Sequence, residues 1–305
     1  MIPADPGAGV PASIEALVVA LREQGYVCDR ALGTSAWLAL KLERPLLVEG
    51  EAGVGKTELA KVLAAALGAR LIRLQCYEGL DVSTAVYEWN YPRQMLEIRL
   101  MEARGQGREA TARDIFGAEF LIRRPLLQAL ESHDGSPPVL LIDEIDRADE
   151  EFEAYLLEIL ADFAVTVPEV GTIVAEQRPR VIITSNRTRE VHDALKRRCL
   201  YHWIDYPSME RELAIVRTRL PDVPDQLARA VVAFIQRLRA ADLTKLPGIA
   251  ETLDWAAALV ALGAPALDRE VVDDTLGVVL KYEEDVRRVR GDTARIYLEE
   301  VAAGA

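Results

Sequence analysis

The sequence of 305 residues carries 36 lysines and arginines against 49 aspartates and glutamates, a formal net charge of −13. This acidic balance makes nucleic acid an unexpected main partner, because proteins that grip a duplex normally present a basic face. Hydrophobic residues make up 50% of the chain, enough for a folded core. A membrane-spanning helix needs about 18 consecutive apolar residues, and no apolar run in the sequence is that long, so stable membrane insertion is not expected.

The three cysteines, Cys28, Cys76 and Cys199, lie far apart and form no C-x-x-C pair. The N-terminus has no basic segment followed by an apolar one. Together these features predict reduced thiols and a cytoplasmic protein. The three histidines show no metal-ligand spacing, and residues 1–12, rich in Pro, Gly and Ala, are expected to form a mobile leader.

The first half of the chain alternates predicted helices and strands. Ser13 and Asp29 are good helix N-caps, and apolar residues follow each of them at helical spacing. Glycine-rich and proline-rich stretches separate the later elements. In chain order, the pattern predicts helices over 13–24 and 29–42, a strand over 45–48, a helix over 58–67, a strand over 71–76, and helices over 93–103 and 120–131.

The second half changes character near residue 207. The apolar run over 139–142 suits a central parallel strand that is covered on both faces. We expect a leader and helix over 1–28, an α/β domain over 29–207 and an all-helical domain over 208–305. The predicted elements are a strand over 139–144, a helix over 150–163, a hairpin over 165–174, a strand over 180–184, a helix over 190–198, a strand over 201–205, and helices over 209–220, 224–240, 249–262 and 269–290.

The segment 77–93 departs from this alternation, because Pro92 and four aromatic residues crowd into it. The proline favours an insertion that interrupts a helix. Two interpretations of the aromatic side chains stay open: they pack the insertion onto its own domain, or they face a partner, flanked by Glu88 and Arg93. The aromatic residues are Tyr77, Tyr87, Trp89 and Tyr91.

A G-x-x-x-x-G-K-T pattern spans Gly50 to Thr57, between a predicted strand and a predicted helix. Its glycines let backbone N–H groups turn towards a phosphate, and the helix N-terminus adds its positive dipole end. Lys56 supplies charge for the β- and γ-phosphates, and the Thr57 hydroxyl is placed to ligate Mg²⁺. A glycine-rich turn with an incidental lysine would not require these flanking elements. The predicted nucleotide site consists of Gly50, Glu51, Ala52, Gly53, Val54, Gly55, Lys56, Thr57 and Glu58.

Further candidate residues lie where strands or a helix end. Asp143 and Glu144 close an apolar strand, where Asp can hold the Mg²⁺ shell and Glu can polarise a water; elsewhere such a pair is a helix cap or a turn. Asn186 closes the next strand, where an amide can orient the same water, although a lone Asn is often a turn residue. Arg197 and Arg198 complement a helix dipole or form an arginine finger for a neighbouring subunit, and we favour the finger, with Arg198 ahead of Arg197.

These segments resemble the motifs of AAA+ ATPases: Walker A at 50–57, Walker B at 143–144, sensor 1 at Asn186 and the finger segment at 197–199. The hairpin before the sensor-1 strand resembles the MoxR branch. Three segments are similar to its CoxD-type members, which are associated with maturation of the aerobic carbon-monoxide dehydrogenase active site. They are Gln75–Asp81, Tyr87–Arg93 and Arg197–Pro207.

The resemblance implies an AAA+ P-loop α/β fold: a doubly wound parallel sheet of strand order 5-1-4-3-2 with a C-terminal all-helical lid. It implies hydrolysis of Mg²⁺-ATP between subunits of a ring, usually a hexamer, with Glu144 activating the water, Asn186 positioning it and Arg198 acting from the next protomer. The implied partners are a von Willebrand factor A-domain protein and a metalloenzyme client such as a molybdenum hydroxylase. One departure is clear, since the stretch 247–254, where the lid usually carries a sensor-2 arginine, has no Arg.

Other functions share the nucleotide motifs. A nucleic-acid motor or restriction-type AAA+ subunit predicts a basic pore or an appended DNA-binding domain, and neither is visible in the sequence. A nucleotide-gated assembly module with little turnover is disfavoured by Glu144, Asn186 and Arg198. A small-molecule P-loop kinase would not need the finger or the late helical domain. The sequence therefore favours an ATPase that remodels a protein client.

Overall fold

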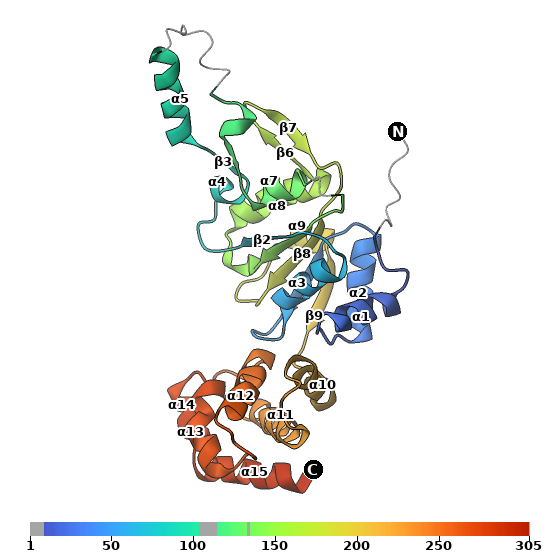
Figure 1. Cartoon of the computed structure of the whole chain (residues 1–305), viewed down its shortest axis with the longest axis vertical. Helices are drawn as coiled ribbons and strands as arrows, with labels where there is room; N and C mark the ends of the chain where they lie inside the picture. Colours follow the sequence, from blue (N-terminus) through green and yellow to red (C-terminus); the bar gives the residue numbers. More distant parts are fainter. Residues whose placement is uncertain (1–8, 104–114, 133–134, 305) are drawn as a thin grey trace.

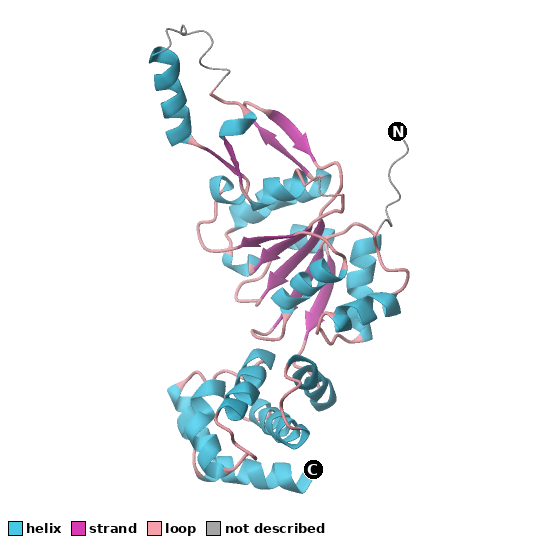
Figure 2. Ribbon diagram, viewed as in Figure 1, coloured by secondary structure: helices cyan, strands magenta, loops and turns pink. Residues whose placement is uncertain are grey.

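The computed structural model describes residues 9–103, 115–132 and 135–304, which form an α/β region followed by a helical region (Figure 1). Residues 1–8 of the predicted leader, together with His133, lie outside the described residues. Figure 2 shows that every strand belongs to the first region and that the last part of the chain is helical. Among the described residues, no helix is both long and apolar enough to cross a bilayer.

A parallel sheet of five strands forms the centre of the α/β region, with the order β2-β5-β8-β1-β9. Counted along the chain, these strands follow the order 5-1-4-3-2, which confirms the predicted doubly wound sheet. All residues of β1 and β5 are buried, as expected for strands covered on both faces. The strands are β1 (Leu46–Gly50), β2 (Leu71–Gln75), β5 (Val139–Asp143), β8 (Arg180–Ser185) and β9 (Leu200–Ile204).

Helices cover both faces of this sheet, and the alternation of side chains along each strand supplies both cores. Leu46 and Val48 of β1 pack in the cluster formed with α1, α2 and α3, whereas Leu47 packs in the cluster with α7 and α8. The predicted caps are confirmed: Ser13 accepts a hydrogen bond from Ala16 N–H, and Asp29 accepts one from Leu32 N–H. The helices are α1 (Ile14–Glu23), α2 (Arg30–Lys41), α3 (Lys56–Ala66), α7 (Pro125–Leu130), α8 (Glu150–Asp162) and α9 (Asp193–Arg198), with the short η2 (Ile145–Arg147).

An insertion between β2 and α7 contains a small antiparallel sheet of β3 and β4. The predicted helix over 120–131 was wrong in its first part, because residues 121–123 pair with β3 and the helix starts only at Pro125. Arg124 precedes the proline and is extended, as the steric clash with a following Pro ring requires. The insertion comprises α4 (Val82–Ala85), β3 (Tyr87–Trp89), α5 (Tyr91–Ala103), η1 (Ala118–Phe120) and β4 (Leu121–Arg123).

The aromatic residues of the insertion divide into two groups. Trp89 is buried and makes edge contacts with the rings of Tyr87 and Phe116, so these residues pack the insertion onto its own domain. Tyr77 and Tyr91 are exposed. Pro92 lies in the first turn of α5, where its missing N–H costs no helical hydrogen bond. Contrary to the prediction, this proline therefore does not interrupt a helix.

The predicted hairpin is confirmed as β6 (Ala164–Val167) paired antiparallel with β7 (Gly171–Val174). The hairpin lies at the same end of the molecule as β3 and α5, away from the helical region (Figure 1). The short helix predicted over 190–198 begins later, at Asp193, after His192 accepts a hydrogen bond from Ala194 N–H. The insertion between β2 and α7 and the β6–β7 hairpin therefore extend the α/β region at the same end.

The helical region has its own core, in which Phe234 and Trp255 pack against one another. The single helix predicted over 269–290 was wrong, because the chain becomes extended at the buried Leu280. The following helix places the buried Asp285 where it accepts hydrogen bonds from Thr244 N–H and Lys245 N–H. The last helix, α15, was not predicted. The predicted domain limits at 28 and 207 stay predictions. The helices are α10 (Met209–Arg219), α11 (Asp225–Arg239), α12 (Ile249–Ala261), α13 (Arg269–Val279), α14 (Glu283–Val289) and α15 (Asp292–Gly304).

Candidate functional site

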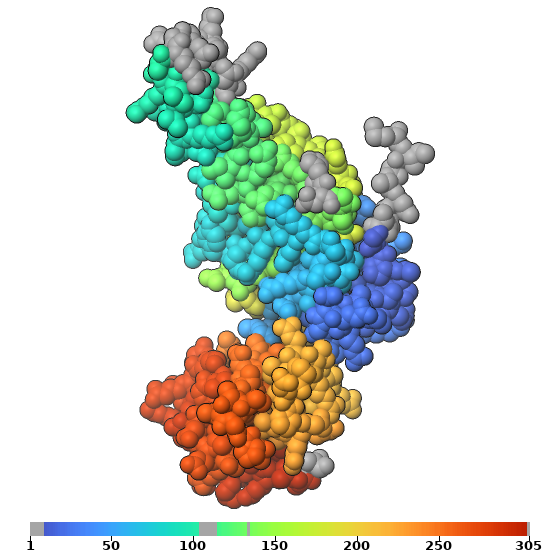
Figure 3. Space-filling view, in the orientation of Figure 1, coloured from blue at the N-terminus to red at the C-terminus, as the bar shows by residue number. Residues whose placement is uncertain are grey.

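A cleft of about 380 Å³ lies between the turn after β1 and the helical region. Figure 3 shows the narrow waist at which the two regions meet. The cleft collects residues from the turn, from the ends of β5 and β8, from the loop between α1 and α2 and from the helical region. Its lining consists of Ala52, Gly53, Val54, Gly55, Lys56, Thr57, Glu58, Lys61, Glu144, Thr184, Asn186, Gly25, Tyr26, Val27, Arg211, Ile215, Arg219, Ile249, Ala250 and Leu253.

The turn between β1 and α3 depends on glycines at specific positions. A Cβ at Gly50 would lie 2.3 Å from the carbonyl oxygen of Ile204, so only glycine fits beside β9 there. Gly53 and Gly55 have φ angles of 77° and 94°, which L side chains rarely adopt. Gly55 is the N-cap of α3 and has no side chain to bond the first N–H groups of the helix. These donors face a site that suits an anion.

Lys56 is buried, with 6% of its surface exposed. Its Nζ donates hydrogen bonds to the carbonyl oxygens of Gly50, at 2.7 Å, and Glu51, at 2.6 Å. Burial lowers the pKa of Lys56 to about 8, although Asp146 and Glu51 nearby oppose this shift. The ammonium group is therefore tied to the turn and still mostly protonated at neutral pH.

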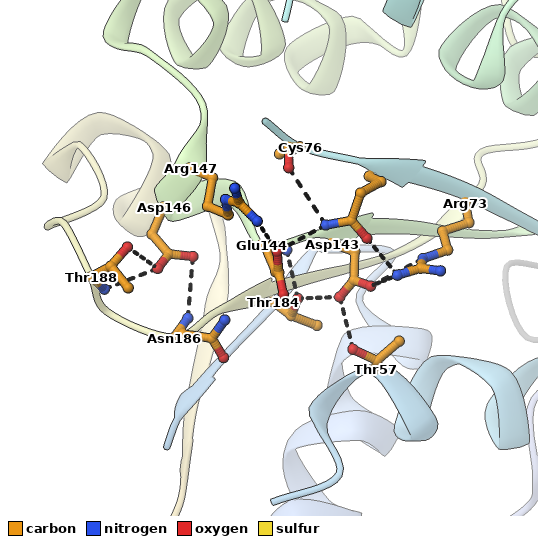
Figure 4. A network of polar contacts seen from close by, with 11 residues as sticks. Thr57, Arg73, Cys76, Asp143, Glu144, Asp146, Arg147, Thr184, Asn186 and Thr188 are labelled. Atoms are coloured by element: carbon orange, nitrogen blue, oxygen red, sulfur yellow. Dashed lines mark hydrogen bonds and ion pairs between the residues drawn. The ribbon is translucent and has the colours of Figure 1, made fainter. Parts of the chain in front are cut away.

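Asp143 at the end of β5 is the centre of a polar network (Figure 4). Its Oδ1 accepts hydrogen bonds from the hydroxyls of Thr57, at 2.9 Å, and Thr184, at 2.6 Å. Its Oδ2 accepts two bonds from Arg73, from Nε at 3.0 Å and from Nη2 at 2.6 Å. Asp143 is only 1% exposed, so these donors satisfy a carboxylate that water does not reach.

Glu144, the next residue, has a left-handed backbone with φ of 58°. Its N–H donates to the Thr184 hydroxyl at 2.9 Å, which fixes the main chain beside the network. One carboxylate oxygen accepts a hydrogen bond from the Gln75 amide at 3.0 Å and a longer one from Arg147 at 3.4 Å. Unlike Asp143, the Glu144 side chain is 34% exposed and lines the cleft.

Asn186 also lines the cleft, immediately after β8. Its N–H donates at 3.2 Å to the buried Asp146, whose other oxygen accepts hydrogen bonds from the N–H and hydroxyl of Thr188 (Figure 4). Asp146 therefore fixes the position of the turn that carries Asn186. This role of Asp146 was not predicted from the sequence, since an acidic residue in a short helical turn has no distinctive pattern.

Arg197 and Arg198 lie outside the set of residues that line this cleft. Both are exposed at the C-terminal end of α9, and Arg198 donates a hydrogen bond to the carbonyl of Leu157 on α8. Arg44 bonds the carbonyl oxygens of both residues, satisfying groups that have no partner within α9. The predicted residues Gly50, Glu51 and Asp143 also lie outside the lining, and they contact lining residues instead: Gly50 and Glu51 accept hydrogen bonds from Lys56, and Asp143 accepts one from Thr57.

The helical region contributes cleft residues that were not predicted from the sequence. Arg211 pairs with Asp29 at 2.7 Å, and Arg219 pairs with Glu58 at 2.8 Å, both across the rim of the cleft. Ala250 lines the cleft in the stretch where the expected lid arginine is absent. No local pattern identifies these arginines, because their acidic partners come from a distant part of the chain.

The oxygen atoms of Thr57, which lines the cleft, and of Asp143, which Thr57 contacts, fit Mg²⁺. This cation prefers hard oxygen ligands, and the Thr57 hydroxyl lies 2.9 Å from the Asp143 carboxylate. Lys56 and the first turn of α3 lie beside this pair and suit the phosphates that usually complete such a site. Thr57 and Asp143 are therefore the residues of this chain that would hold the metal.

The P-loop after β1, the carboxylates after β5 and the helical region over the cleft define a P-loop protein of the AAA+ class. Residues 45–199 match the family model of the AAA domain, dynein-related subfamily. The chain belongs to this family.

Individual similarities outside the family model are distant. An uncharacterized protein of Staphylococcus haemolyticus is 24% identical over 227 residues, which cover 72% of this chain and 77% of that protein. Two solved structures of RuvB variants from Thermotoga maritima share 18% sequence identity and a TM-score of 0.48 with this chain. Those alignments cover 88% and 89% of this chain and 73% of each RuvB chain.

Proposed function

We propose that this protein hydrolyses Mg²⁺-ATP between the subunits of a ring and uses the cycle to remodel or mature a protein client. One observation carries the proposal: Lys56, Glu144 and Asn186, far apart in the sequence, line a single cleft. Each is a residue type that phosphoryl transfer to water requires: a cation for the phosphates, a base for the water and an amide to orient it.

The roles follow from the positions. Lys56 and the N–H groups of the glycine-rich turn bind the phosphates. Thr57 and Asp143 would hold Mg²⁺, which supplies positive charge at the β- and γ-phosphates when bound. Glu144 accepts a proton as the water oxygen bonds to the γ-phosphorus, and the bond to the bridging oxygen breaks to release ADP and phosphate. Asn186 holds the water in line.

Arg198 supports the shared-site part of the proposal, because it is exposed and lies outside its own cleft. An arginine finger supplied by a neighbouring protomer stabilises the charge that develops on the phosphoryl group. Arg197 beside it is the second candidate for this role. A hexameric ring, the arrangement usual for the resembled family, would place each finger at the next cleft.

The client is proposed from the resemblance to CoxD-type MoxR ATPases: a metalloenzyme, and specifically a molybdenum hydroxylase such as carbon-monoxide dehydrogenase. A von Willebrand factor A-domain protein would be the second partner. The positions of the β6–β7 hairpin and of the insertion between β2 and α7 support a protein client. They extend one end of the α/β region, where α5 exposes Tyr91, Met95 and Leu96 (Figure 1).

The test is the release of phosphate from Mg²⁺-ATP by Glu144→Gln, compared with the wild type and with Glu150→Gln. The amide keeps the size of Glu144 and removes the base, so turnover should fall by about two to four orders of magnitude while nucleotide affinity changes little. Glu150 is exposed at the start of α8, and its variant should hydrolyse at the wild-type rate. A Glu144→Gln protein with normal turnover, or a wild type without activity, would refute the proposed function.

A further inference from the structure

The first turn of α12 is hydrogen-bonded to the phosphate-binding turn. Ile249 N–H donates to the carbonyl oxygen of Gly53 at 2.9 Å, and Ala250 N–H donates to the same oxygen at 3.3 Å. The first N–H groups of a helix have no partners within it. Here two of them are satisfied by the P-loop itself, so the helical region and the turn share a direct main-chain contact.

Gly248 permits this contact because it has no side chain. A Cβ at this position would lie 2.8 Å from the carbonyl oxygen of Ala52 and 3.0 Å from the carbonyl carbon of Gly53. Its φ of −85° is available to any residue, so space and not backbone conformation requires glycine here. Glu251 accepts a hydrogen bond from Gly248 N–H at 2.9 Å and holds the start of the helix in this position.

The contact determines how one peptide group of the turn is oriented. The Gly53 carbonyl and the Val54 N–H belong to the same trans peptide and point in opposite directions. When α12 bonds the Gly53 carbonyl, the Val54 N–H is turned away from α12. Gly53 and Gly55 flank Val54 with positive φ angles, and glycine peptides of this kind reorient readily unless something holds them.

Behind α12, a buried polar network ties its first turn to the rest of the helical region. The Thr252 hydroxyl donates to Glu212 of α10 at 2.6 Å, and Arg239 of α11 pairs with Glu212 at 2.7 Å. Arg239 also donates to the carbonyl of Pro247 at 2.8 Å, next to Gly248. Glu212 and Arg239 are almost fully buried. The position of Gly248 is thus coupled to the orientation of the whole helical region.

We propose that Gly248 and the first turn of α12 are a positioning element that orients the Gly53–Val54 peptide for phosphate binding. The N–H groups of Ile249 and Ala250 thus link the helical region to the phosphate-binding turn. They lie in the stretch where the expected lid arginine is absent. The inference rests on the proposed function, because it assumes that the turn binds a nucleotide. By linkage, displacement of α12 weakens nucleotide binding, and nucleotide binding holds α12 in place.

The experiment compares full-length Gly248→Ala with the wild type and with Gly277→Ala, a matched control on α13 that has no atom within 4 Å of the added Cβ. Affinity is measured by equilibrium titration with Mg²⁺-ADP, and hydrogen exchange is followed in a peptide that spans 246–253. Gly248→Ala should weaken Mg²⁺-ADP binding at least tenfold and speed exchange at 249 and 250, with an unfolding temperature close to that of the wild type. In the wild type, Mg²⁺-ADP should slow the same exchange.

A second variant tests the inference if Gly248→Ala does not fold. Glu251→Ala removes the cap of Gly248 without adding volume and should weaken Mg²⁺-ADP binding severalfold, whereas Glu270→Ala on α13 should not. Affinities of Gly248→Ala and Glu251→Ala within twofold of the wild type would overturn the inference. The titration needs no turnover, so a wild type that binds Mg²⁺-ADP but does not hydrolyse ATP refutes only the proposed function. A wild type that does not bind Mg²⁺-ADP refutes both.

Discussion

The side-chain amide of Gln75 donates a hydrogen bond of 3.0 Å to a carboxylate oxygen of Glu144. Gln75 ends β2, and its partner across the parallel ladder is Asp143, the residue before Glu144. The candidate base is therefore engaged by a neighbouring strand in this structure. The bond occupies one of the two carboxylate oxygens and orients the side chain, so its loss should leave the carboxylate freer to reach the attacking water.

Replacing Gln75 by Ala should increase basal ATP turnover. A hydrogen bond of this kind contributes about 0.5–1.5 kcal/mol, so the release of Glu144 predicts a rise of about two- to tenfold in phosphate release at saturating Mg²⁺-ATP. The matched control is Gln128→Ala, because Gln128 bonds the carbonyl of Arg123 on the surface of α7. Equal or lower turnover in Gln75→Ala would show that the bond does not restrain the base.

Arg73 should stabilise the metal-free protein through Asp143. Its guanidinium donates two hydrogen bonds to a carboxylate that is 2% exposed, while Arg73 itself is 49% exposed. Arg73→Ala should therefore lower the free energy of unfolding by about 1 kcal/mol without ligand, the low end of the range for a lost partner of a buried charge. Mg²⁺-ADP should recover much of this loss, since the cation replaces the guanidinium.

Denaturant titrations with and without Mg²⁺-ADP measure this difference, with Arg99→Ala on the remote α5 as the control. The same loss of stability under both conditions would mean that Arg73 and the metal do not act on the same carboxylate.

Nucleotide affinity should fall as the pH rises from 7 to 9. Burial places the pKa of Lys56 at about 8, so most Lys56 is charged at pH 7 and most is neutral at pH 9. Binding to the phosphates favours the charged form, and the proton that must be taken up at pH 9 should cost about tenfold in affinity. Titrations with Mg²⁺-ADP at the two pH values test this, and equal affinities would contradict it.

The same shift predicts the effect on folding. The pKa of Lys56 in the folded chain lies below its ordinary value of 10.5. Between about pH 8 and pH 10.5 the unfolded chain binds more protons, so the contribution of Lys56 to the free energy of unfolding should rise with pH in this window. Lys56→Met should remove this contribution, as judged by denaturant titrations across the window.

The buried thiols should react slowly in the folded protein. Burial raises the pKa of Cys76 and of Cys199 to about 12, so neither forms much thiolate at pH 8. A thiol reagent should modify both residues far more slowly in native protein than in denatured protein, with the sites read by peptide mass. Rapid modification of Cys76 would mean that β2 and β5 separate readily.

Much of the fold was predictable because its determinants are local. Ser13 and Asp29 mark the first two helices, and the apolar run before Asp143 identifies a central strand. The errors arose where contacts between residues distant in the sequence determine the secondary structure. Residues 121–123 become a strand because β3 lies beside them, and the helix predicted over 269–290 breaks where Leu280 turns into the core.

The same distinction applies to the site. Lys56, Thr57, Asp143 and Glu144 belong to contiguous motifs. The structure brings Lys56, Thr57 and Glu144 together in one cleft and joins Thr57 to Asp143 by a hydrogen bond. Gln75 was within reach of prediction, because a polar residue ends a parallel strand at the edge where the sites gather. Gly248 was not, because its requirement for glycine arises only from the approach of a distant helix to the turn.

The central claim, hydrolysis at a site shared between subunits, is tested most directly by the rate of phosphate release per protomer as a function of protein concentration. Molecular mass is recorded in parallel for the wild type, Arg198→Ala and the lid control Arg229→Ala. We predict that the wild-type and Arg229→Ala rates rise as a ring assembles and that Arg198→Ala assembles but loses at least about a hundredfold in rate. A rate that is independent of concentration and unchanged in Arg198→Ala would contradict the shared site.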